Sequence, residues 1–173
     1  FLFYSTVMQV NIALLTVTDT RTIETDKSGS ILVKKINEQK HKLIDRKLVK
    51  DEKKLIKKIL SEWIKQDNID VIITTGGTGL TGRDITPEAI KDLADKEIPG
   101  FGELFRELSY KTVGTSAMQS RACAVLANGK YIFALPGSPG GVTDAWEGIL
   151  KYQLDINHKP CNFVELFPRL KEK

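Results

Sequence analysis

The sequence predicts an α/β fold in which helices cover both faces of a mostly parallel central sheet. Two observations lead to this prediction. Aliphatic runs alternate with amphipathic helical patterns along the chain, and two of these runs end in glycine-rich segments. Such alternation indicates parallel strands, because parallel neighbours need a crossover connection that is usually a helix. The 173 residues suit one domain, which we place at residues 8–173, with residues 1–7 as an N-terminal tail or cloning remnant.

The first half of the chain contains three predicted strands, at residues 10–17, 43–49 and 69–75. The first strand is an aliphatic run that ends at the polar segment Thr18-Asp19-Thr20-Arg21. Two helices separate the strands. One has its apolar positions within residues 31–36, and the other begins near Asp51 and repeats apolar residues, Trp63 included, at helical spacing over residues 55–64.

One strand and four helices are predicted in the second half. Thr86-Pro87-Glu88 is a strong helix start, because Thr can cap the helix, Pro suits its first position and an acid suits its positive end. We expect this helix to reach residue 97, since Pro99-Gly100 then ends it. The other predicted elements are helices at residues 101–108, 116–126 and 142–152 and a strand at residues 131–135.

Composition excludes several classes of protein. With 41% hydrophobic residues and a net charge of +4, the chain is not disordered. It has no apolar stretch near the ~20 residues that span a bilayer. Cys123 and Cys161 are too few for a disulfide scaffold, which indicates a reducing, cytoplasmic setting, and Cys123 lies in an apolar run that should be buried. The isolated His41 and His158 lack the ligand pattern of a transition-metal site.

A basic segment spans residues 34–65, with 12 Lys or Arg and 5 Asp or Glu. Such a segment could attract nucleic acid or an acidic membrane. The alternative is the solvated face of a helix, because Lys53, Lys54 and Lys57 lie opposite the apolar side of the predicted helix. No nucleic-acid recognition motif accompanies them. We therefore expect neither nucleic acid nor a membrane as a partner.

The clearest binding signal follows the third predicted strand and comprises Thr75, Gly76, Gly77, Thr78 and Gly79. Glycines let the backbone approach a ligand and turn N–H groups toward phosphate oxygens. Gly77-x-Gly79-x-x-Gly82 matches the dinucleotide fingerprint, but the next helix begins only at Pro87 instead of directly after the glycines. A P-loop is excluded because Arg83-Asp84 replaces the required Lys-Ser/Thr. A phosphate-binding loop of another kind remains.

Two carboxylates accompany this loop. Asp84 precedes a helix start, where its negative charge can interact favourably with the positive end of the helix dipole. Alternatively, it can bind magnesium, since Mg²⁺ at phosphate sites uses one or two carboxylates together with phosphate oxygens. Asp51 follows the second predicted strand, where it can cap a helix or join the same metal site. Ligands of α/β sheets bind beyond the carboxyl ends of strands, so we expect the site after Val17, Thr75 and Leu135.

Two further segments suit an anionic ligand. Ser116, Ser120 and Arg121 offer hydroxyl groups and a guanidinium near a predicted helix start, although Ser116 alone can be a cap. Pro136-Gly137-Ser138 forms a rigid loop after the last predicted strand. This loop is either a place of close approach to a ligand or simple turn chemistry.

The order of these motifs is specific. It runs from Thr74-Thr75-Gly76-Gly77-Thr78-Gly79 with Asp84 through Thr86-Pro87-Glu88-Ala89 and Pro99-Gly100-Phe101-Gly102-Glu103 to Ser120-Arg121 and Leu135-Pro136-Gly137-Ser138. From about residue 10 to residue 163, the chain resembles the molybdopterin-binding MoaB/MogA family. The resemblance implies a three-layer α/β/α fold and a homo-oligomer, either a trimer or a hexamer. The resemblance is also compatible with contacts with other proteins of molybdenum cofactor synthesis.

The resemblance also implies a reaction. Active relatives use ATP and Mg²⁺ to convert molybdopterin to adenylyl-molybdopterin with release of pyrophosphate, and no tightly bound organic cofactor is expected. By motif, Asp84 and Asp51 match the two catalytic, metal-associated carboxylates. Gly76-Gly77-Thr78-Gly79 matches the phosphate cradle, while Ser120-Arg121 and Pro136-Gly137-Ser138 match residues on the pterin side.

One residue departs from this pattern. Active relatives usually carry Asn where this chain has Ala134, and we expect that position to point at the ligand. A non-catalytic molybdopterin-binding or scaffold protein of the same pathway is therefore the alternative function. Separately, the apolar residues of the predicted helix at residues 101–108 exceed what one short helix buries internally, which favours an oligomer.

Overall fold

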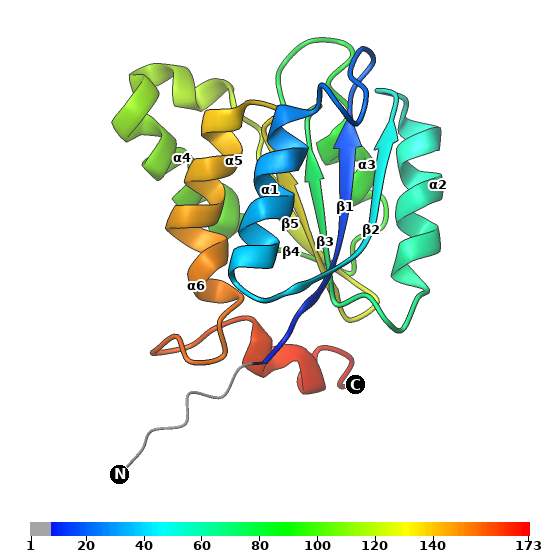
Figure 1. Cartoon of the computed structure of the whole chain (residues 1–173), viewed down its shortest axis with the longest axis vertical. Helices are drawn as coiled ribbons and strands as arrows, with labels where there is room; N and C mark the ends of the chain where they lie inside the picture. Colours follow the sequence, from blue (N-terminus) through cyan, green and yellow to red (C-terminus); the bar gives the residue numbers. More distant parts are fainter. Residues whose placement is uncertain (1–7) are drawn as a thin grey trace.

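The computed structural model describes residues 8–173, so the proposed tail at residues 1–7 lies outside the described residues. One sheet of six strands has helices on both faces (Figure 1), which confirms the predicted fold class. The strands are β1 (Asn11–Val17), β2 (Lys42–Val49), β3 (Val71–Thr75), β4 (Lys96–Glu97), β5 (Cys123–Ala127) and β6 (Lys130–Leu135). The α-helices are α1 (Lys27–Glu38), α2 (Lys53–Ile64), α3 (Thr86–Lys91), α4 (Pro99–Val113), α5 (Pro139–Ala145) and α6 (Lys151–Gln153). Two 3-10 helices, η1 (Gly114–Gln119) and η3 (Val164–Arg169), and one π-helix, η2 (Trp146–Leu150), complete the set.

The strand order places the ends of four strands together. The order is β2-β1-β3-β6-β5-β4, and β2, β1, β3 and β6 run parallel, whereas β5 is antiparallel to both of its neighbours. At their carboxyl ends Val17 pairs with Val49, and Thr75 pairs with Leu135. Loops leave the sheet at this edge, at the top of Figure 1.

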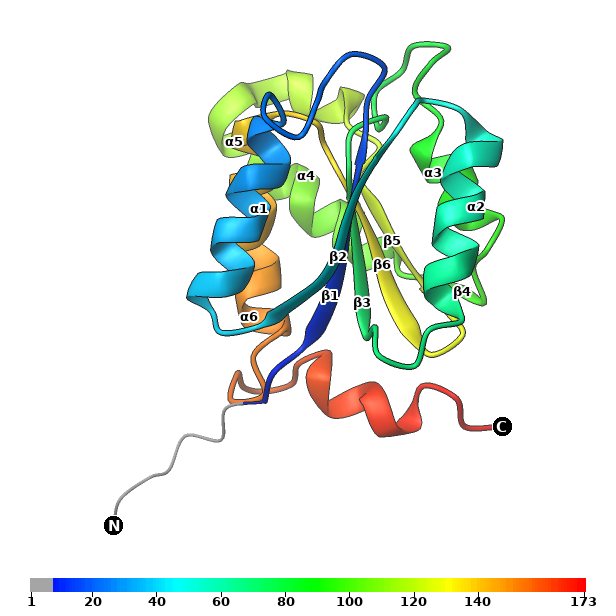
Figure 2. The same cartoon turned by 45° about the vertical axis from the view of Figure 1, so that its right-hand side comes forward.

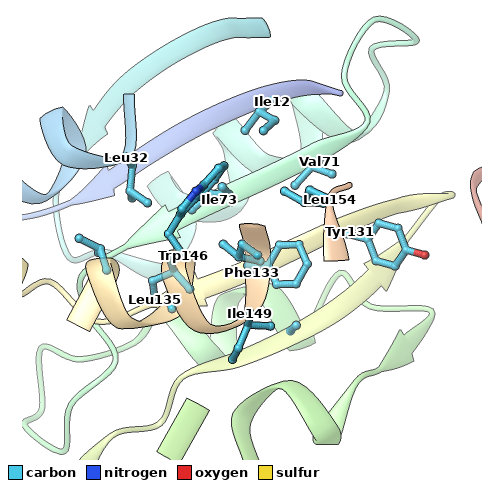
Figure 3. Close-up of a cluster of buried hydrophobic side chains, with 14 of the residues drawn as sticks. Ile12, Leu32, Val71, Ile73, Tyr131, Phe133, Leu135, Trp146, Ile149 and Leu154 are labelled. Atoms are coloured by element: carbon cyan, nitrogen blue, oxygen red, sulfur yellow. The ribbon is translucent and has the colours of Figure 1, made fainter. Parts of the chain in front are cut away.

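Each face of the sheet buries its own apolar core. Figure 2 shows α1, α4, α5 and α6 against one face and α2 and α3 against the other. The first core contains Trp146, Tyr131 and Phe133 (Figure 3), and the ring of Phe133 meets that of Phe101 edge to face at 5.2 Å between centroids. The second core contains Trp63, which is fully buried, as its helical spacing predicted. Burial of a large apolar side chain contributes about 1.5–3 kcal/mol, so these residues fix the helices on the sheet.

The helix predicted over residues 116–126 is wrong. The structure has η1 followed by strand β5, because a short apolar run suits a strand as well as a helix. The deciding signal is Asn128-Gly129, whose positive φ angles of 50° and 74° form the two-residue hairpin turn between β5 and β6. Cys123 is therefore only half-buried on β5, not buried as expected, although burial still raises the pKa of its thiol to about 11.

Other helix ends also differ from the prediction. The helix expected to reach residue 97 ends as α3 at Lys91, since Lys96 and Glu97 pair with β5 as strand β4. Helix α4 extends to Val113, beyond the predicted end at residue 108. None of the helices in residues 8–173 combines the length and the apolar character of a membrane-spanning segment.

Candidate functional site

A cleft of about 340 Å³ lies at the edge where the four parallel strands end. It is formed by the ends of β1 and β3 and by the loops that follow β1, β2, β3 and β6. The cleft therefore lies at the strand ends where the sequence predicted a ligand. The predicted site residues that line it are Asp51, Thr75, Gly76, Gly77 and Gly137.

The loop after β3 is held against its neighbours at Gly76. The Gly76 N–H donates to the Leu135 carbonyl (3.0 Å), and the Thr86 hydroxyl donates to the Gly76 carbonyl (2.9 Å). Gly76 has a φ of +99°, and a Cβ atom there would lie 2.2 Å from the Val17 carbonyl oxygen. This position therefore requires glycine, both for its backbone angle and for the close approach of β1.

Asp51 contributes a carboxylate with little support from the protein. Among residues 8–173, no other residue donates a hydrogen bond to its side chain, and its Oδ1 lies 3.3 Å from the point where a Cβ of Gly77 would stand. Burial raises the pKa of Asp51 above its usual value, and the charges of Asp19 and Asp84 raise it further. A cation at Asp51 would relieve both effects.

Asp84 lies in a different environment. Its Oδ2 accepts hydrogen bonds from the Thr81 N–H (2.9 Å) and the Thr81 hydroxyl (2.7 Å). Burial alone would raise the pKa of Asp84, but these bonds, the Gly79 N–H and the charge of Arg121 outweigh it and lower the pKa. Asp84 thus organises the loop between Gly79 and itself, a role that the sequence did not reveal.

Arg121 joins this loop to the segment before β5. Its Nε donates to the Gly79 carbonyl (2.7 Å), one NH group donates to the Asp84 carbonyl (2.8 Å), and the other pairs with Glu88. Its own N–H donates to the Thr78 carbonyl (2.9 Å). The guanidinium therefore holds the loop in place. Any effect of Arg121 on a ligand would be indirect, through the conformation of that loop.

The two serines predicted with Arg121 lie apart from the cleft. Ser116 is exposed on η1, and Ser120 follows η1 with its carbonyl accepting a bond from Arg106 (3.3 Å). Neither of them lines the 340 Å³ cleft, nor do Thr78 and Gly79. The structure thus separates these residues from the group around Asp51.

The loop after β6 is braced by hydroxyl groups from two other elements. The Thr75 hydroxyl donates to the Pro136 carbonyl (2.7 Å), and the Ser28 hydroxyl donates to the Gly137 carbonyl (2.7 Å). Ser138 caps α5 by accepting a bond from the Gly141 N–H (3.1 Å). Ala134 is fully buried in the core and does not line the cleft, which corrects the expectation that it points at the ligand.

Sequence reasoning expected the site to include the chain after Val17 but missed the acidic residues of this loop. Its Asp26 is buried and accepts bonds from the Thr16 hydroxyl (2.6 Å), the Gly29 N–H (2.9 Å) and Arg46 (3.1 Å). These bonds fix the start of α1 at the wall of the cleft. The polar segment that ends the first strand was visible in the sequence, but its partners are on distant segments.

Asp19, in the same loop, connects three strand ends. Its Oδ1 accepts a bond from the Asp51 N–H (3.1 Å), and both of its oxygens accept bonds from Arg83 (2.8 and 3.0 Å). These bonds lower the pKa of Asp19, that with Arg83 most strongly. Asp19 therefore ties the loop after β1 to the loops after β2 and β3.

The carboxylates suit a magnesium ion that is bound together with phosphate. Within residues 8–173, no three His, Cys, Asp or Glu side chains are grouped so that they could hold a metal by themselves. The Asp51 carboxylate has no competing donor from another residue of the described chain. Mg²⁺ commonly takes one or two carboxylates and completes its shell with phosphate oxygens and water, so Asp51 fits that role.

A larger hollow of about 490 Å³ lies near the opposite end of the sheet, between the end of α1 and the segment from η2 to residue 157. It is lined by His41, Trp146, Lys35 and Glu147, among others. Lys35 and Glu147 already pair with each other at 2.6 Å. The smaller cleft is the candidate ligand site, because of these two hollows it alone combines strand carboxyl ends with a glycine loop.

Known proteins are similar to this chain in sequence and in architecture. The family model described as "Probable molybdopterin binding domain" matches residues 13–155. The chain belongs to this family. Molybdenum cofactor biosynthesis protein B of Escherichia coli (strain K12) is 46% identical over 161 residues, which cover 93% of each chain.

Solved structures agree with this membership. A crystal structure of molybdenum cofactor biosynthesis protein B has a TM-score of 0.87 and 38% identity, covering 97% of this chain and 99% of that one. The tungsten cofactor synthesizing protein MoaB from Pyrococcus furiosus has a TM-score of 0.76 and 36% identity, covering 86% and 94%. The resemblance to the MoaB/MogA family and the three-layer α/β/α fold that it implied are thereby confirmed.

Proposed function

We propose that this protein is an enzyme that adenylylates molybdopterin with ATP and Mg²⁺ and releases pyrophosphate. The observation that supports this proposal best is the Asp51 carboxylate. It lies at the glycine loop with a raised pKa and accepts no hydrogen bond from any other residue of the described chain. A carboxylate left in this state is poised for a cation that accompanies phosphates.

In the proposed reaction, a terminal phosphate oxygen of molybdopterin attacks the α-phosphorus of ATP. A new phosphoanhydride bond forms, the bond between the α- and β-phosphates breaks, and pyrophosphate leaves with its electron pair. The protein supplies no nucleophile. Its task is to bring two anions together, and such reactions depend mainly on positioning and on neutralisation of charge.

Different residues of the chain would bind the two anions and neutralise their charge. When bound, Mg²⁺ neutralises charge on the ATP phosphates. Asp51 would hold that ion, and Asp84 would act beside it while it shapes the loop. The backbone of Gly76-Gly77-Thr78-Gly79 would hold phosphate oxygens, because glycines allow close approach. Of the residues expected on the pterin side, Gly137 lines the cleft and would bind the pterin, and Arg121 would act by holding the loop. Ser116, Ser120, Pro136 and Ser138 lie outside the lining of the cleft and would meet only a part of the pterin that extends beyond it.

The direct test is incubation of the purified protein with molybdopterin, ATP and Mg²⁺, followed by detection of adenylyl-molybdopterin by mass spectrometry. We expect product in the complete mixture and none without ATP or with EDTA. Molybdopterin binding without product under all conditions would contradict the enzyme proposal and favour the non-catalytic binding protein. NADH should cause no fluorescence change, since the glycine spacing does not open directly into a helix.

We also propose that the protein forms a homo-oligomer, a trimer or a hexamer. Phe101 and Phe105 of α4 are buried within the subunit, so they do not supply the free apolar surface that we expected from this helix. The exposed apolar side chains of this region are Leu104 of the expected segment and, further along the chain, Tyr110, Val113 and Met118. Exposed apolar surface of this kind marks protein interfaces. A monomeric mass by light scattering at micromolar concentration would contradict the proposal.

A further inference from the structure

One ion pair joins the loop after β1, which lines the cleft, to the loop after β3. The Arg83 guanidinium donates from Nε to Asp19 Oδ2 (3.0 Å) and from an NH group to Asp19 Oδ1 (2.8 Å). This is the two-point geometry in which arginine binds a carboxylate or a phosphate. Asp19 lines the cleft, whereas Arg83, which directly precedes Asp84, lies beside it and outside its lining.

The pair is easily exchanged because water reaches both partners. The side chain of Asp19 is 37% exposed and that of Arg83 is 60% exposed. Exposed ion pairs of this kind contribute only about 0–1 kcal/mol, so a phosphate that enters the cleft can replace the carboxylate at little cost. Asp19 would keep its bond from the Asp51 N–H (3.1 Å), which stops it from following the guanidinium.

Arg21, which lines the cleft, donates to the Thr25 carbonyl (3.1 Å), and two further arginines at this edge are engaged more fully by the fold. Arg121 donates to the carbonyls of Gly79 and Asp84 and pairs with Glu88. Arg46 pairs with Asp26, which is buried. Removing either guanidinium from its partners would leave buried or loop-shaping groups unpaired, which costs about 1–3 kcal/mol for each such group. Arg83 has no such obligation.

We propose that Arg83 is a phosphate-binding residue of the cleft and that Asp19 holds its guanidinium until a phosphate displaces the carboxylate. The inference rests on the proposed function only in naming ATP and molybdopterin as the two possible sources of that phosphate. Exchange leaves Asp19 with its negative charge beside Asp51. The same event that captures phosphate would therefore free the Asp19 carboxylate to meet the accompanying cation.

The test is the affinity for ATP, measured by calorimetry in EDTA so that neither turnover nor a metal is involved. Asp19→Asn keeps the shape and the acceptor for the Asp51 N–H but frees Arg83. It should bind ATP about threefold to tenfold more tightly than the unmodified protein, as expected from the loss of one exposed ion pair. Arg83→Gln should bind at least about tenfold more weakly.

The double variant distinguishes this exchange from two independent effects. Asp19→Asn should give no gain when Arg83→Gln is already present, because there is no guanidinium left to release. Glu172→Gln is the matched control, since Glu172 forms the same two-point exposed pair with Arg169 (2.9 and 3.1 Å) outside the cleft. It should leave ATP affinity unchanged. Thermal melting of each variant will verify that the fold is intact.

Repeating the titrations with molybdopterin identifies the source of the phosphate. A gain from Asp19→Asn with either ligand supports the inference, and the ligand that shows it is the one that meets Arg83. Weaker or unchanged binding of both ligands to Asp19→Asn would overturn it, as would normal affinity of Arg83→Gln for both. Because these measurements need no product, they can succeed even if adenylylation fails.

Discussion

Asp51 and Asp84 lie at the same edge of the sheet, yet their surroundings are opposite. Asp51, after β2, has a raised pKa and no hydrogen bond from another residue of the described chain to its carboxylate. Asp84, in the loop after β3, has a lowered pKa and accepts two bonds from Thr81. The family motif implies the same role for both acids, but the two carboxylates differ in the hydrogen bonds that they accept within the protein. Under the proposed function Asp51 is available for a ligand, whereas Asp84 also maintains the loop.

The largest expected effect is on catalysis by Asp51→Asn. Loss of a carboxylate that holds a metal against phosphates should lower the rate of adenylyl-molybdopterin formation on the order of a thousandfold. The melting temperature should not fall, because no other residue of the described chain donates a hydrogen bond to the Asp51 carboxylate. Rates are measured by mass spectrometry of the product. Full activity of Asp51→Asn would contradict the proposal that the Asp51 carboxylate holds the metal ion.

A smaller effect is expected on the stability of the loop. Asp84→Ala leaves the Thr81 N–H and hydroxyl without their acceptor and should lower the free energy of unfolding by about 1–3 kcal/mol. Amide exchange at Thr81 and Gly79 should become faster. Asp51→Ala is the paired control and should show neither change. Equal destabilisation by the two variants would mean that both acids are structural.

The pH dependence of stability should have opposite signs for the two acids. The pKa of Asp51 is raised in the folded protein, so its favourable contribution is present below pH about 4 and is lost as the pH rises through the folded-state pKa. Asp51→Asn should therefore be more stable than the unmodified protein at pH 7, by less than about 1 kcal/mol because water screens the group. This advantage should disappear in acid.

The lowered pKa of Asp84 has the reverse consequence. Its stabilising contribution is present above pH about 4 and is lost as the pH falls through the folded-state pKa. Chemical denaturation of Asp84→Asn and the unmodified protein at a series of pH values should show two curves that converge in acid. Curves that diverge in acid would contradict the assignment.

The smallest effect is expected at Asp92, an acid outside the comparison. It lies on the surface, where it pairs with Lys53 (2.9 Å) and Lys57 (3.0 Å) of the basic segment. Asp92→Asn should change the free energy of unfolding by no more than about 0.5 kcal/mol and leave product formation unchanged. The triple change of Lys53, Lys54 and Lys57 to Gln should likewise spare molybdopterin affinity. A large loss in either would connect this surface to the cleft.

The fold could be predicted where the residue pattern permits one interpretation. The aliphatic run of β1 and the apolar stripe of α2 are long and periodic, and both were located to within a few residues. The segment that became β5 is short and rich in alanine, so it suits two structures, and only the turn at Asn128-Gly129 separates them. That signal was interpreted as a helix end.

Only those residues of the site that belong to a local sequence pattern could be predicted. Gly76, Gly77 and Asp51 are evident from their neighbours in the chain, and the structure places them in one cleft. Asp19 and its partner Arg83 are 64 positions apart and meet because β1 lies beside β3 in the sheet. Such a pair has no local pattern. The loop-shaping role of Asp84 was hidden for a different reason, since it depends on backbone geometry within a few residues.

The aromatic stack at the lower end of the sheet has a practical consequence. Tyr131 lies parallel to Phe163 at 4.5 Å between ring centroids, donates its hydroxyl to the Phe163 carbonyl (3.0 Å) and meets Phe167 edge to face. Residues 164–173 are thereby fastened at the end of the molecule away from the loops of the cleft (Figure 1). A linker attached after Lys173 would tether the protein to a sensor surface with its cleft facing the solution, so nucleotide and pterin could be injected over the immobilised protein without steric obstruction from the support.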